Sequence, residues 1–234
     1  MKISGLQKTS LIDYPGKLAC IIFLYGCNFR CGFCHNPELV LTPNGIEYSE
    51  EEILDFLEKR KKQLDGICIT GGEALLTLEK DFVKKIKDLG YSVKLDTNGT
   101  NPEKLKEFID EGLVDYIAMD LKASPEKYNL VAGVNVEMDK LEETIKLMVN
   151  SGVDYEFRTT VIKRYHDEKE LEKMYEWVLK LVGKKPKRYF LQGFANHGKF
   201  IDDSFNQEQN VFGNFLILFK PLAEKYFEEV GIRE

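Results

Sequence analysis

The 234-residue sequence lacks the signals of a secreted or membrane-inserted protein. It has no basic-then-apolar leader and no run of about 18 apolar residues. It also lacks an excess of basic residues, because its net charge is −6 and its pI is near 5.4. A surface that neutralises phosphates needs clustered Lys and Arg. We therefore expect a cytoplasmic protein with neither membranes nor nucleic acids among its partners.

Signals of a second domain are missing too. The sequence has no internal repeat, no low-complexity segment and no linker. Its length exceeds the usual single-domain size but lies within the range that α/β barrels reach as one unit. Hydrophobic residues make up 43% of the chain, which can supply a sizeable core. The sequence predicts one domain over residues 1–234.

Short apolar runs predict six β-strands that alternate with helical segments. The runs cover residues 18–25, 66–70, 92–96, 114–120, 153–162 and 188–192. Regular alternation requires crossover connections and hence parallel strands, in either an open doubly wound sheet or all or part of a β/α barrel. The six predicted β/α units are fewer than the eight of a complete TIM barrel. We therefore expect an α/β fold, a partial (β/α)6 TIM-like barrel of parallel strands with helices outside.

Capping residues and amphipathic spacing mark the helices. Ser49 and Glu52 form a capping box, and Asn101-Pro102 begins another helix. Near the carboxyl end, the apolar spacing predicts a helix. Its apolar residues are Phe212, Phe215, Leu216 and Phe219.

Three of the five cysteines form a C-x3-C-x2-C motif: Cys27, Cys31 and Cys34. Thiolates select soft metals and iron–sulfur clusters. A cubane cluster has four irons, so three sulfur ligands would leave one iron open to a small molecule, which favours catalysis. The alternative is a zinc or closed iron–sulfur site, which needs a fourth ligand such as the adjacent His35.

The other two cysteines, Cys20 and Cys68, lie in apolar strand-like runs. Free cysteine in such surroundings behaves as a small buried hydrophobic residue. We expect both thiols to be buried and chemically inert.

Polar and glycine-rich residues follow several predicted strands. Gly71-Gly72-Glu73 follows the second, Asp96-Thr97-Asn98-Gly99 ends the third, and Asp120 and Lys122 end the fourth. The cysteine motif follows the first. Because active sites of parallel α/β folds lie at the carboxyl ends of the strands, these residues are expected to share one active rim.

These motifs together resemble the radical S-adenosylmethionine (SAM) superfamily. The resemblance implies an oxidoreductase with one 4Fe-4S cluster on Cys27, Cys31 and Cys34, whose open iron binds SAM. One electron from the cluster then cleaves SAM to methionine and a 5′-deoxyadenosyl radical, which abstracts hydrogen from the substrate. This reactivity belongs to the cofactors, and the protein holds and orients them.

The resemblance also implies the residues that contact SAM. Glycines would allow close approach of the backbone, and Glu73 would accept hydrogen bonds from the methionyl ammonium. Phe33 would lie near the adenine, and Lys122 would meet the methionyl carboxylate. The cofactor-binding set is Phe33, Gly71, Gly72, Glu73, Asp96, Asn98, Lys122 and Arg158.

Some of these assignments have structural alternatives. Asp96 and Asp120 would hold the cofactor or, in some members, a monovalent cation, but an Asp-Lys pair at a strand end can equally be a salt bridge. Arg158 is a candidate ligand for the cofactor carboxylate or the substrate backbone, with a buried ion pair as the alternative. Gln192, His166 and His197 follow later strands and are candidates for contacts with ribose or an incoming peptide.

A narrower resemblance is to the activating enzymes of glycyl radical enzymes. It is carried by Asp96-Thr97-Asn98-Gly99, by Met119-Asp120-Leu121-Lys122 and by the segment from Ser10 to Gly16. Tyr14 stands where the pyruvate formate-lyase activating branch typically has Gly, which favours the anaerobic ribonucleoside-triphosphate reductase activating type.

This resemblance implies a protein as substrate. The enzyme would remove an α-hydrogen from one glycine of a glycyl radical enzyme, with a flavodoxin or ferredoxin-type protein as electron donor. A partial barrel would leave a lateral opening for the glycine loop. The alternatives are a small-molecule radical SAM enzyme resembling carboxydeazaguanine synthase, and a non-catalytic iron–sulfur protein.

Overall fold

The computed structural model describes residues 1–41 and 48–233 in two compact units. The first unit comprises Met1–Asn28, Glu38–Thr97 and Glu103–Ala118. The second comprises Phe29–Pro37, Asn98–Pro102 and Met119–Glu234. The boundary falls inside the cysteine motif, after Asn28, so Cys27 belongs to the first unit and the other two motif cysteines belong to the second. The prediction of a single domain stays a prediction.

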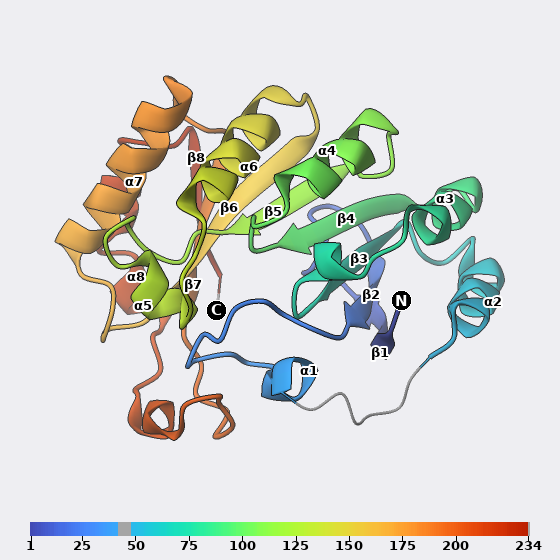
Figure 1. The fold of residues 1–234 in the computed structure, drawn as a ribbon, viewed down its shortest axis with the longest axis horizontal. Coiled ribbons are helices and arrows are strands. Elements are labelled where there is room, and N and C mark those ends of the chain that lie inside the picture. Colours follow the sequence, from blue (N-terminus) through green and yellow to red (C-terminus); the bar gives the residue numbers. More distant parts are fainter. Residues whose placement is uncertain (42–47, 234) are drawn as a thin grey trace. The chain divides into compact units, whose positions relative to one another are not determined.

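The first unit is a mainly parallel sheet with helices (Figure 1). Strand β1 (Ile3–Ser10) pairs antiparallel with β2 (Ala19–Leu24), and β2 is followed by the parallel strands β3 (Gly66–Gly71) and β4 (Ser92–Thr97). The helical segments of this part of the chain are α1 (Pro37–Leu41), α2 (Glu50–Arg60), η1 (Ala74–Leu76), α3 (Lys80–Asp88) and α4 (Pro102–Asp110).

Local sequence explains where these helices begin and which side they bury. The predicted capping box of α2 is present: the Ser49 side chain accepts the Glu52 N–H, and the Glu52 carboxylate accepts the Ser49 N–H. Helix α3 contacts β4 and buries one apolar side, while its Lys and Asp residues face outward. Its buried residues are Phe82, Val83 and Ile86.

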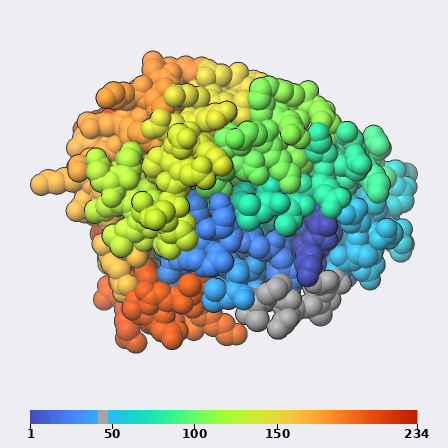
Figure 2. Space-filling model, viewed as in Figure 1, coloured from blue at the N-terminus to red at the C-terminus, as the bar shows by residue number. Residues whose placement is uncertain are grey.

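The second unit is built on the parallel strands β6 (Asp154–Val161), β7 (Arg188–Gly193) and β8 (Glu229–Arg233). Strand β5 (Tyr116–Asp120) begins in the first unit and ends in the second. Helices α6 (Met138–Asn150) and α7 (Glu168–Val182) lie side by side on its outer surface (Figures 1 and 2). The remaining helical segments are α5 (Tyr128–Ala132), η2 (Asp203–Gln207), α8 (Gly213–Leu216) and α9 (Lys220–Ala223).

The α/β prediction is confirmed, and the six predicted strands correspond to β2 through β7. Strand β8 was missed because Glu229–Arg233 is short and has little apolar content. The predicted helix around Phe215 and Leu216 is wrong in extent: α8 and α9 are two helices of four residues each. Pro221 explains the break, because proline suits the first turn of a helix and not its interior. Within residues 1–41 and 48–233, no helix is long and apolar enough to cross a membrane.

Candidate functional site

In the first unit, the residue before Cys27 is fixed by backbone hydrogen bonds. Gly26 has a left-handed φ of 94° and donates its N–H to the Leu39 carbonyl at 2.9 Å. The Gly26 carbonyl accepts the Glu73 N–H at 2.7 Å. The loop after β2 and the loop after β3 are therefore bonded to each other directly beside the first cysteine of the motif.

Gly71 and Gly72 make this loop contact possible. A Cβ on Gly71 would lie 2.3 Å from the Leu24 carbonyl oxygen, and one on Gly72 would lie 2.0 Å from the Gly26 carbonyl oxygen. Both obstacles are backbone atoms that have little freedom to move. The glycines thus have a structural role, the close approach of two strand-end loops, in addition to the cofactor role that the sequence predicts.

Glu73 is buried, with 1% of its surface exposed. Its Oε1 accepts the Leu75 N–H at 3.1 Å, as the N-cap of η1, and the Thr97 hydroxyl at 2.9 Å. Two donors therefore fix the orientation of this carboxylate. Thr97 was not singled out from the sequence, although its place between Asp96 and Asn98 at the end of a strand could have indicated it.

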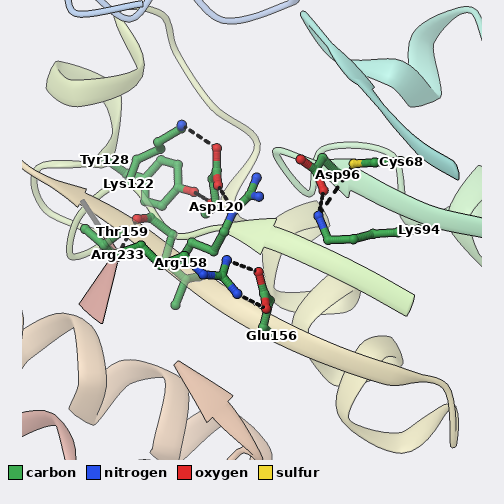
Figure 3. Close-up of polar contacts among 11 residues, drawn as sticks. Cys68, Lys94, Asp96, Asp120, Lys122, Tyr128, Glu156, Arg158, Thr159 and Arg233 are labelled. Atoms are coloured by element: carbon green, nitrogen blue, oxygen red, sulfur yellow. Dashed lines mark hydrogen bonds and ion pairs between the residues drawn. The ribbon is translucent and has the colours of Figure 1, made fainter. Parts of the chain in front are cut away.

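Asp96, at the end of β4, has a buried lysine as partner. The Lys94 ammonium forms an ion pair with Asp96 Oδ1 and lies 3.7 Å from Cys68 Sγ, as Figure 3 shows. The Lys94 side chain is 2% exposed and that of Asp96 is 13% exposed. Asn98, two residues on, closes the turn: its Oδ1 accepts the Thr100 N–H and hydroxyl at 3.1 and 2.7 Å.

In the second unit, the rest of the cysteine loop is held at both ends. The Arg30 N–H donates to the Ala132 carbonyl at 2.8 Å, and a Cβ on Gly133 would lie 2.1 Å from the Arg30 carbonyl oxygen. The Gly32 carbonyl accepts the Asp202 N–H at 3.1 Å. Backbone hydrogen bonds to the end of α5 and to the start of η2 thus hold the segment that bears Cys31.

Phe33 is a core residue of this unit. Its ring centroid lies 6.3 Å from that of Tyr165 and 6.0 Å from that of Phe205, and the Lys122 ammonium lies 5.8 Å from the ring centroid. Only 4% of its surface is exposed. Phe33 therefore packs in the core of this unit, and its contact with the adenine stays a prediction.

Asp120 and Lys122, at the end of β5, form a three-residue charge cluster with Arg158, in the second half of β6. Asp120 Oδ2 lies 2.9 Å from Lys122 Nζ, and its Oδ1 lies 2.8 Å from Arg158 Nε (Figure 3). These two cations hold the pKa of Asp120 below its ordinary value against the opposing effect of burial, and the carboxylate raises the pKa of Lys122. The cluster carries a net charge of +1, which suits an anionic ligand such as a carboxylate.

The same charge cluster influences Cys31. Burial raises the pKa of the Cys31 thiol, and the Lys122 ammonium opposes that rise by favouring the thiolate. Cys34 donates its backbone N–H to the Cys31 carbonyl at 3.0 Å.

A second ion pair on β6 was missed by sequence reasoning. Glu156, which is fully buried, accepts two hydrogen bonds from Arg233 at 2.5 and 2.7 Å, and the guanidinium carbon lies 3.6 Å from the centroid of the Phe190 ring. Glu156 and Arg158 are two residues apart on β6 and so share one side of the strand. This shared side could have indicated Glu156 from the sequence. Its partner Arg233, however, lies on β8, a strand that was not predicted.

His166 is engaged at both ring nitrogens and is 2% exposed. Its Nδ1 accepts the Ile162 N–H at 3.0 Å, which assigns the proton to Nε2, and Nε2 donates to the Lys122 carbonyl at 2.8 Å. His166 therefore positions the Lys122 backbone, which differs from the contact with ribose or peptide for which the sequence made it a candidate.

We expect His166→Gln to flatten the dependence of stability on pH. Burial lowers the pKa of His166 in the folded protein. As the pH falls below about 6.5, this histidine is protonated more readily in the unfolded chain than in the folded protein, and the folded protein therefore loses stability. Urea unfolding at pH 7.5 and 5.0 measures this loss in wild type and variant. An equal loss in both would contradict the assignment.

His35 and His197 lie together in the second unit, with ring centroids 5.3 Å apart. Burial and the neighbouring charges of His197 and Lys122 lower the pKa of His35. Gln192 is the register partner of Arg233 and Thr160 near the end of β7. No ligand role follows for these residues from their contacts, and their candidate roles stay predictions.

The donor chemistry fits a 4Fe-4S cluster with one open iron. Cys27, Cys31 and Cys34 lie on one short loop and form no disulfide, and a buried cation near Cys31 favours the thiolate. In the described part of the chain, no group of three or more His, Cys, Asp or Glu side chains is already drawn together around a metal position. The ligand assignment therefore rests on donor type and spacing and stays a prediction.

Comparison with known proteins identifies relatives. The Radical SAM superfamily profile matches residues 21–178. A Methanocaldococcus jannaschii protein, provisionally named a glycyl-radical enzyme activating enzyme, is 35% identical over 99% of this chain and 95% of its own length. The pyruvate formate-lyase-activating enzyme of Clostridium pasteurianum is 28% identical over 72% of each chain.

Solved structures share the fold at low sequence identity. A domain of the pyruvate-formate lyase-activating enzyme from Bacteroides vulgatus has a TM-score of 0.57 at 20% identity, covering 71% of this chain and 98% of that one. Streptococcus suis SuiB bound to S-adenosylmethionine has a TM-score of 0.66 at 12% identity, covering 92% of this chain. The present chain spans about half the length of SuiB, 51%. The superfamily profile and the 35% identical relative cover most of this sequence, and the chain belongs to the radical SAM superfamily.

Proposed function

We propose that this chain is an activating enzyme that forms a glycyl radical on a partner protein. The observation that carries the proposal is the 35% identity, over 99% of the chain, to a relative named for this activity. Pyruvate formate-lyase-activating enzymes among the further relatives support the same class. The substrate is accordingly a protein with a glycine loop, and the alternative of a small-molecule substrate becomes an outcome of the test.

The residues of the chain bind and orient the cofactors. When bound, the reduced cluster and SAM supply the radical that takes the glycine α-hydrogen. The net positive cluster of Asp120, Lys122 and Arg158 suits the methionyl carboxylate, and the fixed carboxylate of Glu73 suits the methionyl ammonium. Because these charged side chains are already held in position before the substrate binds, little reorganisation of the site is needed during the reaction.

For the identity of the partner, we propose anaerobic ribonucleoside-triphosphate reductase, on the basis of Tyr14. The Tyr14 side chain is buried against Tyr116, with ring centroids 5.9 Å apart, and lies over Gly66. The residue thus has a packing role in the first unit, and its support for one partner comes from the resemblance alone. A flavodoxin or ferredoxin-type electron donor is part of the same proposal.

The test is radical formation on purified partners under anaerobic conditions. The cluster-loaded, reduced enzyme is mixed with SAM and either an anaerobic ribonucleotide reductase or a pyruvate formate-lyase. We expect an electron paramagnetic resonance signal of a glycyl radical, in step with 5′-deoxyadenosine, on the reductase. A signal on pyruvate formate-lyase alone would overturn the choice of partner. SAM cleavage without a radical on any glycyl radical enzyme would favour the small-molecule alternative, and no cleavage at all would favour a non-catalytic iron–sulfur protein.

A further inference from the structure

Strand β4 places a lysine beside the carboxylate expected at the cofactor site. Lys94 and Asp96 are two residues apart and therefore point to the same side of the strand. The Lys94 ammonium pairs with Asp96 Oδ1, and its second contact is Sγ of Cys68, its register partner on β3, at 3.7 Å (Figure 3). All three residues belong to the first unit.

The lysine occupies a costly position. Its side chain is 2% exposed, and the adjacent strand residues Val93 and Leu95 are fully buried. Removing an ammonium from water is unfavourable unless an opposite charge compensates for it, and a long side chain loses much rotamer freedom when it is fixed. An apolar residue would avoid both costs. The retained charge therefore points to an electrostatic task at Asp96.

Both carboxylates for which the resemblance implies a monovalent cation have basic side-chain partners. Asp96 has Lys94, and Asp120 has Lys122 and Arg158. An ammonium is a compact point charge with three donors, so it can neutralise a carboxylate as a bound alkali cation would. A metal cation at Asp96 Oδ1 would be repelled by the ammonium already there.

We propose that Lys94 is a built-in monovalent cation: its ammonium supplies at Asp96 the positive charge that a bound Na⁺ or K⁺ would otherwise provide. SAM binding by this chain is then independent of alkali cations. The inference rests on the cofactor-site assignment of Asp96 within the proposed function, but it does not depend on which protein is activated.

The experiment compares wild type with Lys94→Met in the cluster-loaded protein under anaerobic conditions. Buffers contain Na⁺, K⁺ or N-methylglucamine chloride at equal ionic strength. Thermal unfolding is followed without SAM or partner, and SAM affinity is measured by calorimetry. In wild type we expect the unfolding midpoint to differ by less than about 1 °C among the three buffers, and the SAM affinity to be the same in all of them. In Lys94→Met we expect Na⁺ or K⁺ to raise the unfolding midpoint by about 3 °C or more, and to tighten SAM binding about tenfold.

Two further variants make the outcome decisive. Lys87→Met removes a surface ion pair with Asp115. In this variant the unfolding midpoint and the SAM affinity should not depend on which cation the buffer contains. Lys94→Gln keeps a hydrogen-bond donor near Asp96 and replaces Lys94→Met if that variant does not fold. Wild type that needs Na⁺ or K⁺ for SAM binding would overturn the proposal, and so would folded Lys94 variants without a cation response. Because unfolding is measured without SAM or partner, these results are separable from a failure of the activating function.

Discussion

Replacing Cys31 with alanine is expected to lower reductive SAM cleavage at least about 1000-fold. The loss follows because only three thiolates are available to hold the cluster, and a catalytic unit that loses one essential member loses most of its activity. Cys31 is buried in the segment clamped by α5 and η2, so no other ligand can readily replace it. The measurement is 5′-deoxyadenosine release by the reduced, reconstituted enzyme, with the iron content determined in parallel.

Cys20→Ala is the matched control. Cys20 is a fully buried thiol on β2, and burial raises its pKa to about 12, so it remains protonated and does not ligate metal. We expect full iron content and near wild-type cleavage in this variant, with a modest loss of stability from the smaller side chain. Full cleavage by Cys31→Ala, or loss of the cluster in Cys20→Ala, would show that the ligand assignment is wrong.

Replacing Asp120 with asparagine is expected to weaken SAM binding about 10- to 100-fold, because the carboxylate orients two predicted cofactor ligands, Lys122 and Arg158. The variant should also unfold with a free energy about 2–3 kcal/mol smaller, since two mostly buried cations lose their compensating charge. Calorimetric titration with SAM and urea unfolding at pH 7 measure the two effects separately.

The pH dependence supplies an independent check. The pKa of Asp120 is lower in the folded protein than in the unfolded chain, where it is about 3.9. Its stabilising contribution is therefore fully present above about pH 5 and is lost as the pH falls through the unfolded-state pKa toward the lower, folded-state pKa. Asp120→Asn should lose less stability than wild type over this range. Asp110→Asn, which removes an exposed helix pair with Lys106, should behave as wild type, and an Asp120 variant with the same acid sensitivity as wild type would contradict the role of the charge cluster.

The structure also shows why some residues could be selected from the sequence and others could not. Cys27, Glu73 and Lys122 were selectable because each follows a strand, and Arg158 because it lies late in one. The period of a strand and its end are local properties of the chain. Thr97 could have been selected on the same ground.

The partners of these residues are a different matter. Lys94 and Cys68 looked like ordinary members of apolar runs, and Glu156 meets Arg233 across 77 positions of sequence. Such pairs form because parallel strands bring distant segments into register, and no sequence period encodes which distant residue will be opposite.

The sequence alone determined the class of chemistry and the parallel direction of the predicted strands. Thiolate spacing is covalently set by the chain, and alternation of apolar runs with amphipathic helices requires parallel strands. Only the tertiary structure decided which charges compensate one another: Lys94 with Asp96, Lys122 and Arg158 with Asp120, and Arg233 with Glu156. The physical reason is that an electrostatic interaction depends on the distance between two groups and on their burial, and both are properties of the folded chain.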